Sequence, residues 1–231
     1  KFLISEKWIN FFKALVAAKV NIIVSGGTGS GKTTFLNLLL NELSPLERVI
    51  TIEDTKELNF KSPNNVRLFT ALANSGMENP LQMRDLVKNT LRMRPDRIVV
   101  GECRAGEALD MLQAMNTGHD GSMTTIHANN ARDAVSRLEN MIAMAGIDMP
   151  LKAARAQIAS AVNLIVQASR LQDGSRRMVS ITEITGMEGE IVSMQEVFRY
   201  QRLGLEPNGK IIGRFTGCGV RSHFSERFRQ W

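Results

Sequence analysis

The residues with the clearest chemistry form the stretch Gly26-Gly27-Thr28-Gly29-Ser30-Gly31-Lys32-Thr33. This order matches the phosphate-binding pattern G-x-x-x-x-G-K-[ST]. Glycine adopts backbone angles that are closed to other residues, so consecutive N–H groups can point at phosphate oxygens. The pattern predicts that Lys32 contacts the β- and γ-phosphates of a nucleotide and that the Thr33 hydroxyl binds Mg²⁺. The predicted nucleotide-binding residues are Gly26, Gly27, Thr28, Gly29, Ser30, Gly31, Lys32, Thr33 and Thr34.

The flanks of this loop have the context that the chemistry needs. The apolar run Ile22-Ile23-Val24 precedes it, and a second apolar run, from Phe35 to Leu40, follows. Together they predict a strand, a loop and a helix whose N-terminus faces the anion. The alternative, a glycine-rich turn without function, does not explain both flanks.

A pair of acids forms a second candidate group. The apolar run Val49-Ile50-Thr51-Ile52 predicts a buried strand, and Glu53 and Asp54 follow it directly. In α/β sheets the carboxyl ends of the strands collect the groups that bind ligands. We therefore expect these carboxylates near the phosphate loop, the alternative being an ordinary acidic surface turn.

A third candidate is the acid at the end of another apolar strand. Ile98-Val99-Val100 is followed by Gly101-Glu102, which has the shape of a Walker B element with Gly in place of the usual Asp. Glu102 is predicted to orient a metal-bound water, with Thr33 as the direct protein ligand to Mg²⁺. Thr33 and Glu102 are thus the predicted metal-site residues.

Two histidines, His119 and His127, lie in the stretch Gly118–Ala128 among Gly, Ser and Thr residues. Placed at a strand end, they are candidates for contact with a phosphate group, and His127 is a predicted site residue. The alternative is a structural role for both. A zinc site is disfavoured because there is no C-x-x-C pair and only one further histidine, His223.

Hydrophobic periodicity places these motifs on alternating elements. It predicts an α/β fold with a mostly parallel core sheet flanked by helices over residues 1–161. Residues 162–231 instead show short strands and turns, which predict a second, smaller domain packed on the core. It is expected to contain an antiparallel β-meander and a terminal amphipathic helix from Arg221. Helices are expected over 5–18 (with Ser5 as N-cap), 32–43, 130–144 and 150–161, and from Asn79-Pro80 onward; residues 66–70 are expected to form an edge strand or a hairpin.

Composition narrows the class of protein. The 231 residues are 43% hydrophobic and 23% charged, which is ordinary for a globular protein, and no apolar run approaches the length of a membrane span. Two cysteines predict a reduced compartment rather than a disulfide framework. The net charge of +6 permits an acidic partner or only a solvated basic surface. Lys1 stands where a methionine is expected, which predicts that the natural chain begins earlier.

Taken together, these motifs resemble the type II/type IV secretion (VirB11-like) superfamily of P-loop ATPases. The amino-acid sequences of residues 114–122 and of Ile211-Ile212-Gly213-Arg214 most resemble those of the CpaF-type ATPase of Tad/Flp pilus assembly. The resemblance implies a RecA-like P-loop fold, with the family's N-terminal domain missing before residue 1. The residues that carry it are those of the phosphate loop, Ile52–Leu58, Arg92–Arg104 and Gly118–Ala128.

The resemblance also implies roles for single residues. Lys32 and Thr33 would contact ATP phosphates and Mg²⁺, and Glu53 would be the water-activating base. Glu102 would be the Walker B acid, and His127 would report on the γ-phosphate. Lys32, Glu53, Glu102 and His127 are therefore the expected catalytic residues, while Arg92, Arg94 and Arg104 are candidates for contacts within or between subunits.

The resemblance further implies ATP hydrolysis that powers Tad/Flp pilus assembly or type II/IV secretion across the bacterial envelope. It implies a homo-hexamer that is cytoplasmic and peripheral to the inner membrane, where it meets a platform protein. No stable complex with nucleic acid is expected.

Other functions stay open at this point. A RecA-like nucleic-acid translocase or a conjugative-transfer ATPase would suit the basic C-terminal region, although that region lacks interleaved aromatic residues for base stacking. A module that holds ATP without hydrolysing it is disfavoured by the full set of acids and histidines. A GTPase is disfavoured because no Asn-Lys-x-Asp motif is present.

Overall fold

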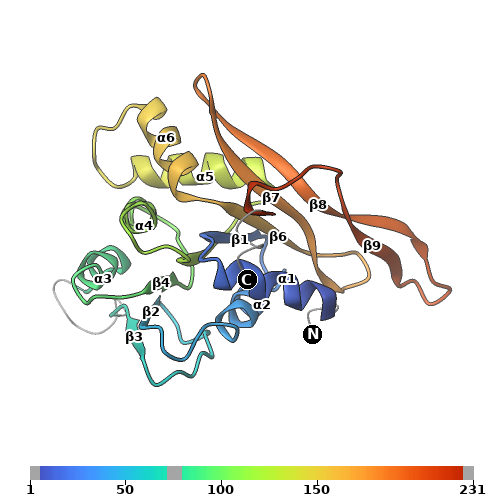
Figure 1. Cartoon of the computed structure of the whole chain (residues 1–231), viewed down its shortest axis with the longest axis horizontal. Helices are drawn as coiled ribbons and strands as arrows, with labels where there is room; N and C mark the ends of the chain where they lie inside the picture. The colour runs from blue at the N-terminus through green and yellow to red at the C-terminus, as the bar shows by residue number, and fades with distance from the viewer. Residues whose placement is uncertain (1–5, 72–79, 226–231) are drawn as a thin grey trace.

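The computed structural model describes residues 6–71 and 80–225. Its centre is a nine-stranded sheet in the order β3-β2-β4-β5-β1-β6-β7-β8-β9, with helices on both faces (Figure 1). Among the described helices, none is long and apolar enough to cross a membrane.

In the order of the sheet, the strands β3, β2, β4, β5, β1 and β6 all run parallel to one another. β1, β2, β4 and β5 are buried along their whole length, as expected for strands covered on both faces. Their carboxyl ends therefore lie along one edge of the sheet. The bounds of these strands are β1 Ile22–Gly26, β2 Val49–Glu53, β3 Asn65–Phe69, β4 Arg97–Val100, β5 Met123–Ile126 and β6 Leu164–Arg170.

The remaining strands continue the same sheet as an antiparallel meander. They are β7 (Arg176–Glu188), β8 (Ile191–Leu205) and β9 (Ile211–Gly217). β6 joins the two parts, because it is parallel to β1 on one side and antiparallel to β7 on the other. The predicted boundary at residue 162 therefore falls before β6, whereas the strand direction changes after β6, between Arg170 and Arg176. Both parts belong to one continuous sheet, and the division into two domains stays a prediction.

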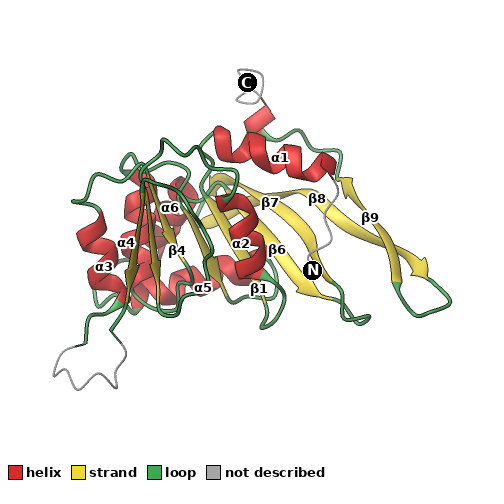
Figure 2. Cartoon of the chain, turned by 90° about the horizontal axis from the view of Figure 1, so that it is seen from below, coloured by secondary structure: helices red, strands yellow, loops and turns green. Residues whose placement is uncertain are grey.

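The helices form two layers, one on each face of the sheet (Figure 2). Each layer has its own hydrophobic core. One face of the sheet packs against α1 (Glu6–Ala17) and α2 (Lys32–Leu40), and the other packs against α3 to α6. The indole of Trp8 on α1 also contacts Phe198 and Phe215, with ring centroids 4.8 and 4.6 Å apart, so α1 supports the meander too. The other helices are α3 Met83–Thr90, α4 Glu107–Asn116, α5 Ala131–Ala143, α6 Leu151–Ala161 and the 3₁₀ turn His223–Ser225.

Most predicted elements are confirmed, and the differences lie at their ends. The strand predicted at 66–70 is the edge strand β3, paired in parallel with β2 rather than in a hairpin. α2 ends at Leu40 and α3 begins at Met83, later than expected, where the Asp85 carboxylate accepts the Gln82 N–H at 3.1 Å. The predictions for Ser5, for Asn79 and for the stretch beyond 225 lie outside the described residues.

A candidate nucleotide site at the carboxyl edge of the sheet

A hollow of about 520 Å³ opens at the carboxyl edge, where the ends of β1, β2, β4 and β5 meet. The sequence predicted that the phosphate loop, the acids and a histidine would converge there, and they do. The hollow is lined by Thr28, Gly29, Lys32, Thr33, Glu53, Asp54, Thr55, Glu57, Gly101, Glu102, Arg104, Thr125, His127 and Arg137.

The phosphate loop leaves β1 and turns directly into α2. Gly29 and Gly31 have φ angles of 70° and 95°, in the left-handed region that favours glycine. A Cβ atom on Gly26 would come within 2.5 Å of the Ala168 carbonyl oxygen, so only glycine fits there. The Ser30 hydroxyl is buried without a hydrogen-bond partner in the described part of the chain, while Thr34 is exposed and does not line the hollow.

Lys32 lies at the first position of α2 with its ammonium group at the loop. Its Nζ donates to the carbonyl oxygens of Gly26 and Gly27 at 3.0 and 3.1 Å. Partial burial lowers the pKa of Lys32, while the charges of Glu102 and Glu57 oppose that shift. The site therefore holds a partly desolvated cation, and the lower local dielectric constant strengthens its attraction for an anion.

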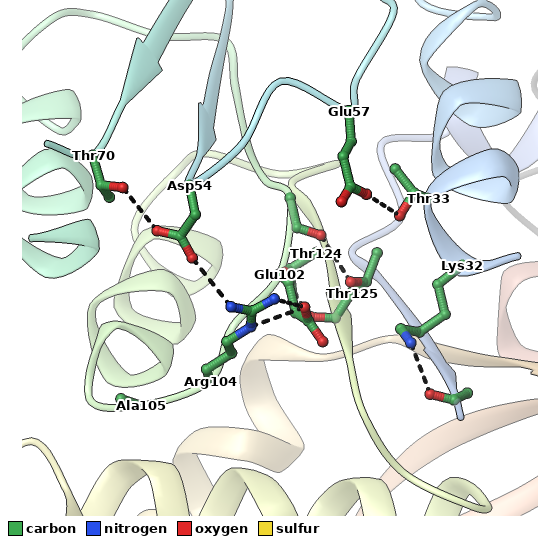
Figure 3. Close-up of polar contacts among 12 residues, drawn as sticks. Lys32, Thr33, Asp54, Glu57, Thr70, Glu102, Arg104, Ala105, Thr124 and Thr125 are labelled. Atoms are coloured by element: carbon green, nitrogen blue, oxygen red, sulfur yellow. Dashed lines mark hydrogen bonds and ion pairs between the residues drawn. The ribbon is translucent and has the colours of Figure 1, made fainter. Parts of the chain in front are cut away.

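Thr33 is linked to the acidic segment after β2. Its hydroxyl donates to Glu57 Oε2 at 2.9 Å (Figure 3). Asn37, one turn further along α2, donates to the Glu57 carbonyl oxygen and accepts the Asn59 N–H at 3.2 and 2.7 Å. The helix thus holds Glu57 beside the predicted magnesium ligand, although sequence reasoning had not selected Glu57. The sequence did contain a signal for it, because Glu57 lies four residues after Glu53 in the same acidic stretch.

Glu53 is buried, with 2% of its surface exposed. Its Oε1 accepts the N–H groups of Glu57 and Leu58 at 2.9 and 2.6 Å, and its Oε2 accepts from Arg67 at 3.1 Å. Both oxygens are therefore used to shape the loop after β2. Glu53 forms part of the wall of the hollow, whereas Glu57 extends into solvent beside Thr33.

Glu102, at the end of β4, is paired with Arg104 (Figure 3). Arg104 donates through Nε and Nη2 to Glu102 Oε2 at 2.9 and 2.6 Å, and its Nη1 lies 3.6 Å from Asp54 Oδ2. The hydrogen bonds and charge of Glu102 raise the pKa of Arg104. Thr70 at the end of β3 donates to Asp54 Oδ1 at 2.9 Å, so Arg104 connects the ends of three strands.

The backbone beneath Arg104 is fixed by the start of α4. The buried Glu107 carboxylate accepts the N–H groups of Arg104 and Ala105 at 2.6 and 2.9 Å. Thr125 on β5 donates to the Gly101 carbonyl oxygen at 2.8 Å. These bonds orient the loop after β4 so that Glu102 and Arg104 face the hollow.

The two histidines of the Gly118–Ala128 stretch lie at opposite ends of β5. His127 follows the strand and lines the hollow, whereas His119 precedes it and lies at the other edge of the sheet. Arg92 and Arg94 likewise come before β4, away from the hollow, and of the three candidate arginines only Arg104 lines it. Arg137, on α5, also lines the hollow, and no sequence motif had pointed to it.

The donor set fits ATP with Mg²⁺. A glycine cradle, a helix N-terminus and Lys32 suit phosphate oxygens, and a threonine hydroxyl with nearby carboxylates suits a hard cation that keeps several waters. In the described part of the chain, no group of three or more His, Cys, Asp or Glu is arranged to hold a metal by itself. The cation would therefore depend on the phosphates for much of its coordination.

Comparison with known proteins places this geometry in a family. Residues 4–203 match the profile of the family described as type II/IV secretion system protein. A putative conjugal transfer protein of Mycobacterium tuberculosis is 41% identical over 177 residues, which cover 77% of this chain and 50% of that protein. The chain thus spans about half the length of the curated relatives it matches.

Solved structures show the same fold. The VirB11 ATPase of the Brucella suis type IV secretion system, in complex with sulphate, superposes with a TM-score of 0.68 and 32% identity, over 76% of this chain and 51% of that chain. The pilus retraction motor PilT with bound ADP gives a TM-score of 0.58 and 26% identity, over 76% and 49%. The predicted RecA-like α/β fold is confirmed.

Proposed function

The chain belongs to the type II/IV secretion system protein family, and from this premise we propose that it is the ATPase part of a motor for secretion or pilus assembly. The observation that carries the proposal is the convergence of Lys32, Thr33, His127 and the carboxylates of the strand ends on one hollow. The VirB11 relative in complex with sulphate and the PilT relative with ADP support an anion and a nucleotide as its occupants.

In the proposed mechanism the chain holds the triphosphate and aligns a water molecule. The loop N–H groups and Lys32 would bind the phosphates, and the Thr33 hydroxyl would bind the magnesium ion. Mg²⁺, when bound, supplies charge neutralisation at the β- and γ-phosphates. Glu102 would orient the water molecule, and His127, at the end of β5, would contact the γ-phosphate.

We assign the water-activating base to Glu57 rather than to the predicted Glu53. A general base needs an oxygen that is free to accept a proton and within reach of the water. Both Glu53 oxygens already accept from the protein, whereas Glu57 Oε1 has no hydrogen-bond partner in the described residues and Oε2 lies 2.9 Å from Thr33. The position of Glu57 beside Thr33, the proposed magnesium ligand, supports its role as the general base.

The test is phosphate release with and without Mg²⁺. We expect Lys32→Ala and Glu102→Gln to lose turnover, and Glu57→Gln to lose it while it still binds ATP. Turnover near the wild-type level in Lys32→Ala would contradict nucleotide hydrolysis at this site. Turnover near that level in Glu57→Gln, with loss in Glu53→Gln at unchanged stability, would return the base role to Glu53.

The oligomeric state and the location of the protein are further proposals. We propose a cytoplasmic homo-hexamer, peripheral to the inner membrane, whose partner is a membrane platform protein of a Tad/Flp-type pilus or a secretion system. Measuring the mass in solution with and without a non-hydrolysable ATP analogue tests the ring. A mass that stays that of one chain, in a polypeptide long enough to span the relatives, would contradict it.

A conjugative-transfer role is the second candidate, because a putative conjugal transfer protein is among the relatives of the chain. A translocase that acts on DNA would show ATP turnover that rises with added single-stranded DNA and falls with salt. A motor for pilus or protein export would show no such stimulation.

A further inference from the structure

The antiparallel extension carries two adjoining hollows that share no residue with the nucleotide hollow. They lie between the β6–β7 turn and the β8–β9 hairpin, which reaches away from the helical layers (Figure 1). The first hollow has a volume of about 510 Å³ and the second about 390 Å³, and Arg170 lines both. Four of the residues that line the first hollow are cationic: Arg170, Arg176, Arg177 and Lys210.

A hydrogen-bonded clasp holds the first hollow together. Asp173 in the β6–β7 turn accepts from the Ser175 N–H and hydroxyl at 2.9 and 2.6 Å, and its other oxygen accepts the Ile211 N–H at 2.8 Å. These bonds lower the pKa of Asp173 to about 2. Arg177 donates to the Ile211 carbonyl oxygen at 3.3 Å. The start of β9, and with it Lys210, is thereby fastened beside the arginines.

Three of the four cations of this hollow have no carboxylate partner in the described part of the chain. Arg170, Arg176 and Lys210 are exposed, and none forms an ion pair within residues 6–71 and 80–225. Arg170 lies on β6, Arg176 on β7 and Lys210 in the turn before β9. The fold therefore brings three positive charges together although they repel one another. The one carboxylate present, Asp173, already accepts from fixed donors. A polyoxygen anion such as a phosphate group matches this arrangement.

The second hollow adds an apolar surface next to the cations. Leu171, Val179 and Ile211 line it, together with Tyr200, whose hydroxyl is buried and without a partner among the described residues. Arg202 also lines it. A ligand that fills both hollows would carry an anionic group beside an apolar one.

We propose that the paired hollows bind the phosphate group of an amphiphilic anion, with the lipid of an anionic bilayer surface as the favoured source. Three large apolar residues of the β8–β9 hairpin are exposed: Leu203 (56%), Leu205 (54%) and Ile212 (43%). Apolar side chains next to cations, as in the lining of the second hollow, suit the boundary between headgroups and acyl chains. Single-stranded nucleic acid fits less well, because the Tyr200 ring packs over Gly213 beneath Arg177 and cannot stack on a base.

Vesicle sedimentation tests the proposal with matched variants. The test variant is Arg170→Gln/Arg176→Gln/Lys210→Gln, and the control is Lys61→Gln/Lys88→Gln/Arg132→Gln, which makes the same change of charge at exposed positions elsewhere. Each cation removed near an anionic surface weakens binding about fivefold, so the test variant should bind phosphatidylglycerol vesicles about a hundredfold more weakly. The control should bind like the wild type, and phosphatidylcholine vesicles should bind none of the three proteins.

A second experiment, with a soluble phosphate ligand, distinguishes a lipid from a soluble phosphate ester as the source of the phosphate group. Inorganic pyrophosphate is titrated by calorimetry into proteins that also carry Lys32→Ala, which weakens binding at the phosphate loop. Vesicle binding that the test variant alone loses supports the lipid source. Pyrophosphate binding that it alone loses, without vesicle binding, supports a soluble phosphate ester.

The proposal is overturned if the test and control variants behave alike in both arms, or if the wild type binds neither probe. The single variant Arg176→Gln, with an expected fivefold loss, replaces the triple variant if the latter does not fold. Neither triple variant should alter ATP turnover, because none of the six residues lines the nucleotide hollow. Failure of this proposal is therefore distinguishable from failure of the ATPase assignment.

Discussion

Glu53→Gln is the substitution that distinguishes a structural role of Glu53 from a role as the general base. The change keeps the size of the side chain and removes its negative charge. In the wild type the Glu53 carboxylate accepts two backbone N–H groups and the Arg67 guanidinium, which also donates to the Leu58 carbonyl oxygen at 2.6 Å. A carboxamide can still accept through its oxygen, but its NH₂ group would face the guanidinium, donor against donor.

The structure sets the size of the effect. Removing one partner of a buried ion pair costs about 3–5 kcal/mol. The Glu53 side chain is 2% exposed but that of Arg67 is 25% exposed, so water can partly solvate the remaining charge. We therefore expect a loss of about 2–3 kcal/mol in the free energy of unfolding. For a domain of this size that corresponds to a fall in Tm of about 4–12 °C.

The assay pairs thermal unfolding with single-turnover ATP cleavage below the Tm of the variant. Glu57→Gln is the matched control, because Glu57 is exposed and its replacement should change the free energy of unfolding by about 0.5 kcal/mol or less. We expect Glu53→Gln to lose stability and keep the cleavage step, and Glu57→Gln to do the reverse. A Glu53→Gln protein with wild-type Tm and no cleavage would refute the assignment of Glu53 to the wall.

Three other predictions follow from single contacts. Arg104→Ala should leave Glu102 unpaired and weaken Mg·ATP binding by about tenfold, measured by nucleotide titration, and Arg104→Lys should restore it only in part. Arg97→Ala should destabilise by about 3–5 kcal/mol in urea unfolding, since buried Arg97 pairs with Glu47. Burial raises the pKa of Cys103 to about 12, so at pH 8.5 iodoacetamide should spare it in the native protein; the stability from its neutral thiol is complete below pH 9 and lost as pH rises toward 12.

Sequence reasoning could find the strand ends because one-dimensional patterns encode them. An apolar run followed by Glu53, Glu102 or His127 is visible in the sequence, and parallel strands must bring such ends together. The same logic misplaced His119, since it stands before β5 rather than after it. The direction of a strand decides which of two nearby residues reaches the site.

The contacts between strand ends could not be predicted in this way. The bond between Thr33 and Glu57, and that between Arg104 and Asp54, join residues 24 and 50 positions apart whose side chains carry no periodic signal. Arg137 reaches the hollow only because α5 packs beside β6. Glu53 also illustrates the limit, because an acid at a strand tip can serve the chemistry or the loop beneath it, and burial decides between the two roles.

The charge of the nucleotide hollow indicates that Mg²⁺ strengthens the binding of ATP. Lys32, Arg104 and Arg137 line it against the carboxylates of Glu53, Asp54, Glu57 and Glu102, so cations number three and carboxylates four. A triphosphate would add further negative charge to this site, and like charges at about 4 Å repel by about 4 kcal/mol at an effective dielectric constant of 20. The repulsion can be offset only by a bound cation, by movement of Arg104 from Glu102 to the phosphates, or by cations from another subunit. We therefore expect ATP without Mg²⁺ to bind at least about tenfold more weakly than Mg·ATP, and equal affinities would contradict the proposed roles of the carboxylates.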